Sequence, residues 1–134
     1  MSLPIGEVAA RSGVSVDTLR FWEREGLIDP PGRTAGGRRA YDESVLDLLE
    51  VITSLRAVGF GLDDVRRVLG VKASSATVAG RVAGMREAIG ELEGVLDERA
   101  AALDRARGHL AGWRAELDAG EPWPDTVIGE PAAD

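Results

Sequence analysis

The sequence predicts a mainly α-helical protein in which a small head of short helices is followed by one long helix. Two observations support this fold class. Short segments with helical apolar spacing end at glycines in the first half, and an apolar residue recurs every seven positions in the second half. The 134 residues have room for one compact domain or a small domain with an extension.

The first two helices are predicted from their end signals. The segment "PIGEVAARSGVS" has apolar residues at helical spacing and stops at Gly13, a natural C-terminal cap. Ser15 can cap a second helix, which carries Asp17 in its first turn and stops near Gly26. Two short helices joined by a glycine-containing turn form a helix-turn-helix pattern.

The next segment, "IDPPGRTAGGRRAY", predicts a hairpin. Pro30 and Pro31 are incompatible with a helix, and Gly36 with Gly37 signals a tight turn between two extended arms. A small hairpin with a cationic tip, a wing, is therefore expected. Its candidate functional side chains are Arg33, Arg38, Arg39 and Tyr41.

Two supporting helices follow the wing. The first, "DESVLDLLEVITSLRAVGF", is expected to begin at the capping residue Asp42. Its apolar stripe comprises Val45, Leu48, Leu49, Ile52 and Leu55. The second, "LDDVRRVLG", ends at Gly70. We therefore expect a winged helix-turn-helix domain at residues 1–70 and a linker at residues 71–75.

One long helix is predicted from about residue 75 to residue 119. Its first set of heptad positions is Val82, Ile89, Leu96, Leu103, Leu110 and Leu117, and its companion set is Val78, Met85, Leu92, Arg99, Ala106 and Trp113. This spacing is typical of a coiled coil. A helix about 60 Å long cannot bury such a seam against a small head, so a homodimer is expected.

The seam sets the remaining boundaries: a dimerisation helix at residues 76–119 and a tail at 120–134. The expected dimerisation residues are Val82, Met85, Ile89, Leu92, Leu96, Leu103, Leu110, Trp113 and Leu117. Arg99 interrupts the seam. Either it snorkels or pairs with a residue such as Asp97 or Glu98, and can set the register near the two-fold axis of an antiparallel pair, or the seam is shifted so that Ala100 lies inside.

Charge and composition exclude several functions. The formal net charge of −7 argues against non-specific coating of nucleic acid, but residues 11–39 carry six arginines against four acids. The sequence has no cysteine, which excludes disulfides and thiolate metal sites, and His109 alone cannot hold a metal. We expect no cofactor. A cytoplasmic protein without a membrane partner is expected because no apolar run suits a signal peptide or membrane span.

At this point the sequence resembles a known family. "IGEVAARSGVSVDTLRFWEREGLIDP", "RTAGGRRAY" and "LRAVGFGLDDVRRVL", taken in this order, resemble the MerR family of bacterial transcription regulators over roughly residues 4–70. The resemblance implies a winged helix-turn-helix head on an antiparallel coiled-coil dimer. It also implies binding to a pseudo-palindromic promoter operator, distortion of that DNA, and RNA polymerase as a candidate partner.

The resemblance also assigns residues. It places Arg20 and Thr18 at the groove, Trp22 near the DNA backbone, and the wing residues on phosphates. Arg38 departs from the "GYRxY" pattern by replacing its first tyrosine. The candidate DNA-binding set is Ser15, Thr18, Arg20, Trp22, Arg24, Arg33, Arg38, Arg39 and Tyr41.

The residues themselves leave alternatives. Arg20 and Arg24, one turn apart, can project together and grip phosphate or guanine. Alternatively, they can form weak ion pairs on a solvated face with Asp17, Glu23 or Glu25. Leu19 can anchor the helix with either Phe21 or Trp22, and the low aromatic content favours Trp22 and Phe60 as core residues.

The alternative function is a coiled-coil interaction module with a helix-turn-helix that does not bind DNA. The acidic second half, with twelve acids against seven basic residues in 70–134, supports it. An enzyme is not expected, because the sequence shows neither a nucleophile–base pair nor a glycine-rich phosphate loop. Without cysteine, the thiol-based metal and redox sensing of some MerR relatives is excluded. The effector, target genes and sign of regulation stay open.

Overall fold

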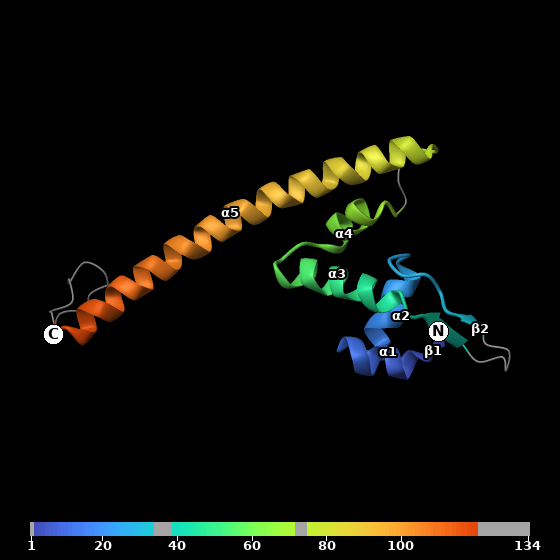
Figure 1. Cartoon of the computed structure of the whole chain (residues 1–134), viewed down its shortest axis with the longest axis horizontal. Coiled ribbons are helices and arrows are strands. Elements are labelled where there is room, and N and C mark those ends of the chain that lie inside the picture. The colour runs from blue at the N-terminus through green and yellow to red at the C-terminus, as the bar shows by residue number, and fades with distance from the viewer. Residues whose placement is uncertain (1, 34–38, 72–74, 121–134) are drawn as a thin grey trace, which may run out of the picture. The chain divides into compact units, whose positions relative to one another are not determined.

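The computed structural model describes residues 2–33, 39–71 and 75–120 (Figure 1). The chain forms two compact units, Met1–Leu92 and Glu93–Asp134. We call the first the head unit, and residues 93–118, the helical part of the second, the rod segment. The functional boundaries at residues 70, 75 and 119 stay a prediction.

The helix-turn-helix consists of α1 (Ile5–Ser12) and α2 (Val16–Arg24). Helix α1 ends where Gly13 adopts a positive φ of 75°, a conformation that glycine reaches without a steric penalty. The Ser15 side chain accepts a hydrogen bond from the backbone N–H of Thr18 at 3.1 Å and so caps α2. Both end signals identified in the sequence are confirmed.

A three-stranded antiparallel sheet forms the wing and ties it to the N-terminus. It contains β1 (Ser2–Leu3), β2 (Gly32–Arg33) and β3 (Arg39–Asp42) in the order β1-β3-β2. The two predicted hairpin arms are confirmed as β2 and β3, while the predicted turn at Gly36 and Gly37 lies outside the described residues. Strand β1 was not predicted, because two residues are too few to show an alternating pattern.

Helices α3 (Val45–Ala57) and α4 (Leu62–Leu69) support the helix-turn-helix. The expected start of α3 at Asp42 was wrong: Ser44 occupies the capping position and the helix begins at Val45. The carboxylate of Asp42 instead accepts a hydrogen bond from the backbone N–H of Ser44 at 2.9 Å, forming a turn before the helix. Helix α4 ends at Gly70, whose φ is 70°, as expected.

One hydrophobic core holds the head unit together. The stripe predicted on α3 faces it, with three members buried and Leu48 and Leu55 packed against them. Trp22 and Phe60 are buried, which confirms their assignment as core residues. The largest fully buried side chains are Leu19, Ile28, Leu49, Ile52, Val8 and Val65. Because the core draws on α2, α3, α4 and the wing, it fixes the surface of α2 relative to the sheet.

Helix α5 (Val78–Asp118) contains 41 residues and belongs to both units. Ala88 and Leu92 in its first half are buried, whereas every residue from 97 to 120 is exposed. The single long helix predicted from the heptad spacing is confirmed. Among the described helices, none is long and apolar enough to span a membrane.

Candidate nucleic-acid interface

Helix α2 has two distinct faces. Leu19 and Trp22, three residues apart, lie in the core, and Trp22 is only 7% exposed. Phe21 is 39% exposed on the other side of the helix. The anchor of α2 is therefore Leu19 with Trp22, and Phe21 is the aromatic ring at the surface.

Arg20 and Arg24 occupy the exposed face of α2. Together with Glu23 of the same helix they line a pocket of about 160 Å³, which Ile5, Pro31 and Tyr41 complete. Within the described part of the chain, neither arginine forms an ion pair with a neighbouring acid. The solvated ion-pair alternative is therefore not what the structure shows, and both guanidinium groups are available to a ligand.

The first turn of α2 is organised by two hydroxyl groups. The Ser15 hydroxyl donates to the Thr18 hydroxyl at 2.9 Å while accepting from the Thr18 backbone N–H. Ser15 is exposed and Thr18 is half-buried. Both candidates thus lie at the positive end of the helix dipole, where an anion is stabilised.

The buried side chain of Tyr41 connects the wing to α2. Its side chain is 3% exposed, and its hydroxyl donates a hydrogen bond to the Glu23 carboxylate at 2.8 Å. Trp22 is similarly buried. The structure therefore places these two members of the candidate DNA-binding set in the core, where they position the surface residues. The sequence suggested Glu23 only as a possible partner of Arg20 or Arg24, because a partner 18 residues away leaves no local signal.

The wing arginines flank the hairpin tip. Arg33 in β2 and Arg39 in β3 are directly opposite each other in the antiparallel register. The side chains of these two residues, and Arg38 entirely, lie outside the described residues. Their assignment stays a prediction.

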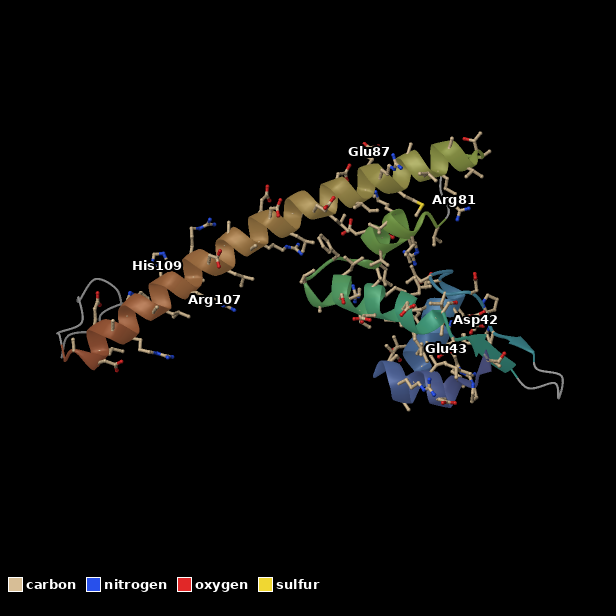
Figure 2. The ribbon with its side chains drawn as sticks, viewed as in Figure 1. Asp42, Glu43, Arg81, Glu87, Arg107 and His109 are labelled. Carbon is tan, nitrogen blue, oxygen red and sulfur yellow. The ribbon has the colours of Figure 1, made fainter. Side chains whose placement is uncertain are left out.

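Asp42 is the last residue of β3 and lies at the connection from the wing to α3 (Figure 2). Hydrogen bonds from the backbone N–H and side chain of Ser44 lower the pKa of its carboxyl group, because they stabilise the charged form. Asp42 is thus a structural carboxylate that fixes the connection between β3 and α3.

The predicted dimerisation residues separate into two groups. Leu92 is buried within the chain, and Met85 and Leu96 are half-buried. The other members are exposed: Val82, Ile89, Leu103, Leu110, Trp113 and Leu117. The exposed apolar positions therefore continue through the rod segment.

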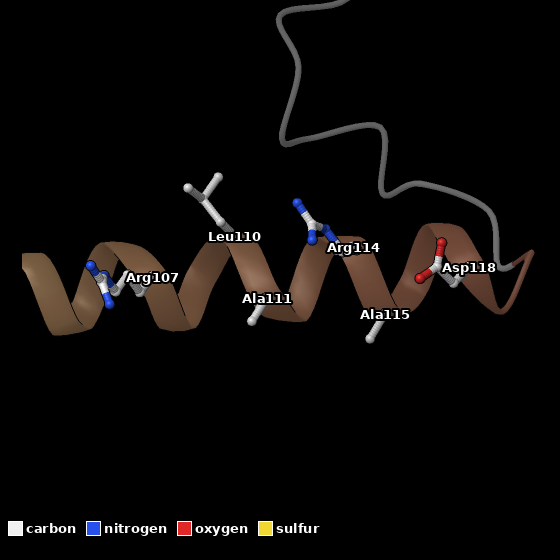
Figure 3. Close-up of a pocket in the computed structure, with 6 residues that line it drawn as sticks. All are labelled: Arg107, Leu110, Ala111, Arg114, Ala115 and Asp118. Carbon is white, nitrogen blue, oxygen red and sulfur yellow. The ribbon is translucent and has the colours of Figure 1, made fainter.

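The rod segment also carries an open hollow of about 390 Å³. Figure 3 shows Leu110 projecting from α5 between Arg107 and Arg114, and Ala111, Ala115 and Asp118 complete the lining. His109 is exposed on the same helix (Figure 2). The described residues contain no group of three or more His, Cys, Asp or Glu side chains that could hold a metal ion.

Comparison with known proteins shows which family has this architecture. The family model for the MerR HTH family regulatory protein matches residues 3–71. The mercuric resistance operon regulatory protein of Bacillus cereus is 41% identical over 71 residues, which is 53% of this chain and 54% of that protein. The matched region thus spans about half the length of that relative.

Two solved structures share the fold along most of the chain. A protein from Listeria monocytogenes, described as a MerR family transcriptional regulator, is 28% identical with a TM-score of 0.65, covering 89% of this chain and 91% of that one. HiNmlR, a MerR family regulator lacking the sensor domain and bound to promoter DNA, is 24% identical with a TM-score of 0.66, covering 90% and 97%. On the matched residues 3–71, this chain belongs to the MerR family of helix-turn-helix regulatory proteins.

Proposed function

We propose that this protein is a transcriptional regulator that binds a pseudo-palindromic promoter operator as a homodimer and distorts it. The observation that carries the proposal is the exposed pair of arginines on α2, Arg20 and Arg24, beside the base of the wing. Two arginine forks one turn apart can contact guanine edges or phosphates in a major groove. The wing is suited to adjacent phosphates, which position the protein without reading sequence.

The DNA contacts divide by exposure. Ser15, Thr18, Arg20 and Arg24 meet the duplex from α2, and the wing arginines Arg33, Arg38 and Arg39 meet flanking phosphates. Trp22 and Tyr41 act from the core by holding α2 and β3 in place. Exposed Phe21 packs against the sugar-phosphate backbone. For the residues of α2 and for Tyr41 this division follows from burial, because only exposed groups can contact a duplex without unfolding the head. The wing arginines are assigned from the family resemblance alone.

The homodimer is supported by the apolar positions of the rod segment. Leu103, Leu110 and Leu117 are 62%, 63% and 58% exposed at heptad spacing. Burying these side chains against a second copy removes apolar surface from water, which is the main driving force of coiled-coil association. In an antiparallel pair, which the family resemblance implies, both heads of one dimer bind the same operator.

The names of the relatives support DNA binding but not a shared signal. HiNmlR was solved on promoter DNA although it lacks a sensor domain, and the Bacillus cereus relative is named for a mercuric resistance operon. This chain contains no cysteine, so mercury sensing through thiolates does not carry over. The interaction-module alternative is not favoured, because it leaves the exposed arginines of α2 without a role.

The decisive experiment replaces Arg20. The wild-type chain first selects a duplex from a random-sequence pool, and fluorescence anisotropy then gives affinities for that duplex. We expect Arg20→Ala to weaken binding by about 1–3 kcal/mol, as for a lost base or paired phosphate contact. The matched control is Arg11→Ala on α1, where the arginine is ion-paired with Glu7 at 2.6 Å.

The control separates a specific contact from a change in net charge. Arg11→Ala also removes one positive charge, but Arg11 is not among the proposed DNA contacts. It should therefore change affinity only slightly and reduce the salt dependence little. Equal losses in both variants would contradict the assigned role of Arg20. A wild-type chain that selects no duplex above background would overturn the proposed function itself.

A further inference from the structure

Within the head unit, helix α4 makes ionic contacts with two other elements. On one side, Arg66 reaches the Glu25 carboxylate, at the end of α2, with 3.1 Å between the charged atoms. On the other side, Arg67 forms an ion pair with Glu91 of α5 at 2.6 Å. The hydrogen bond and charge of Glu91 raise the pKa of Arg67. Neighbouring residues of α4 therefore contact the end of α2, the proposed recognition helix, and α5, the proposed dimerisation helix.

The Arg66 guanidinium is poorly solvated. Its side chain is 18% exposed, and a second nitrogen binds Asp63 at 2.7 Å. Among the described side chains, its Nε is a buried nitrogen without a hydrogen-bond partner. A partly desolvated charge depends on its carboxylate partners more strongly than a surface charge does. Asp63 is 96% exposed and on α4 itself, so Glu25 is the partner that joins two elements.

The residues at the end of α4, Gly70 and Val71, pack closely against their neighbours. The Gly70 carbonyl accepts a hydrogen bond from Arg81 Nε of α5 at 3.1 Å. A Cβ built on Gly70 would lie 2.7 Å from Met85 Sδ, and one on Gly26 would lie 3.6 Å from Val71. The end of α2, the end of α4 and the start of α5 thus meet within one small region of the head unit.

We propose that the Glu25–Arg66 bridge sets the angle of the recognition helix relative to the dimerisation helix and thereby selects operator half-site spacing. This inference rests on the proposed function. In a dimer, two recognition helices must enter major grooves about one helical turn, or ~34 Å, apart. In each protomer α2 is connected to α5 through α4, so a small rotation of α2 on α4 changes the distance between the two recognition helices of the dimer. Glu25 and Arg66 are positioning residues that need not touch DNA.

The test measures spacing discrimination by the full-length dimer. The probes are the selected duplex, versions with about one or two base pairs inserted or deleted between the half-sites, and a single half-site. We expect the wild type to prefer the selected spacing by at least about tenfold, and Glu25→Gln or Arg66→Met to reduce that preference to about threefold or less. Affinity for the single half-site should not change, because the contact surface of α2 is intact.

Two further variants and one double variant distinguish positioning from general damage. Asp63→Asn removes the other carboxylate on Arg66 without breaking the link between helices, so discrimination should persist. Glu7→Gln breaks a comparable ion pair on α1 and serves as a second control. The double variant Glu25→Gln/Arg66→Met should be no worse than either single variant, since both remove one interaction. Wild-type discrimination in both single variants would overturn the proposal.

A DNA-independent measurement tests the bridge even if no operator is found. Because the sequence has no cysteine, spin labels attach only at introduced Asp17→Cys and Gly84→Cys positions, and a Cβ at Gly84 meets nothing within 4 Å. Labelled chains are diluted into excess unlabelled chain, and pulsed electron resonance gives the α2–α5 distance distribution. We expect Arg66→Met to broaden or shift it and Asp63→Asn to leave it unchanged. An unchanged distribution in Arg66→Met would refute the positioning role independently of DNA binding.

Discussion

The head unit and the rod segment use the same aliphatic residues in opposite ways. In the head, Leu49 and Ile52 of α3 are almost fully buried within the chain, while Leu103 and Leu110 of the rod are more than half exposed. Both sets follow helical apolar spacing, so local pattern does not distinguish them. The difference is the number of elements packed around each helix. The head completes its core by itself, whereas the rod presents a seam that needs another surface.

The largest expected effect comes from placing charge in the rod seam. Leu103→Asp/Leu110→Asp removes four apolar side chains from a dimer, each worth about 1.5–3 kcal/mol when buried, and adds carboxylates there. We expect the dimer dissociation constant, measured by sedimentation equilibrium, to rise by more than about 1000-fold. Operator binding should fall with it, while the far-UV signal of the head unit persists.

The matched control carries the same two charges on the opposite side of α5. Ala101 and Ala115 occupy outer heptad positions and are exposed, so Ala101→Asp/Ala115→Asp should leave the dimer intact. If both double variants dissociate alike, or if the seam variant stays dimeric, the rod does not associate through the assigned seam.

An intermediate effect is expected in the head core. Leu49 is 1% exposed, and Leu49→Ala should lower the free energy of unfolding of the head by about 2–5 kcal/mol through lost burial and a cavity. Urea denaturation followed by far-UV circular dichroism measures it. Leu117→Ala, the same truncation at a rod position, should change the unfolding of the head by less than about 0.5 kcal/mol. Similar losses in the two variants would show that the head depends on the rod for stability.

The smallest expected effect concerns Asp42 and pH. Its carboxyl pKa is lowered by hydrogen bonds from Ser44, so the folded state favours the charged form. The resulting stabilisation is present above the unfolded pKa of about 3.9 and is lost as pH falls through the lower folded pKa. We expect Asp42→Ala to lower Tm slightly near pH 7 and to match the wild type at strongly acidic pH. Glu43→Ala is the control, and a difference that persists in acid would assign the effect to packing instead.

Much of the fold could be predicted from short-range signals. Gly13 and Gly70 mark helix ends because glycine reaches positive φ without strain, and Ser15 marks a helix start because its hydroxyl caps the next turn. The seven-residue repeat predicted the long helix. The start of α3 was misplaced because Asp42 and Ser44 can both cap, and local sequence does not decide between them.

The candidate site was predicted in part. Arg20 and Arg24 were identified from their spacing, and the structure places both on the exposed face of α2. The low aromatic content favoured Trp22 as a core residue, but the sequence left open whether Phe21 or Trp22 anchors α2 together with Leu19. Tyr41 was assigned a surface role, and only its burial against α2 revealed the bond to Glu23.

The sequence by itself thus determined where helices begin and end, which stretch is cationic, and that a long apolar seam exists, because these depend on residues within a turn or a heptad of one another. The tertiary structure decided which aromatic is buried, how β1 joins the wing, and that Arg66 reaches Glu25 from 41 positions away along the chain. Such contacts depend on the packing of whole elements, and no local spacing encodes them.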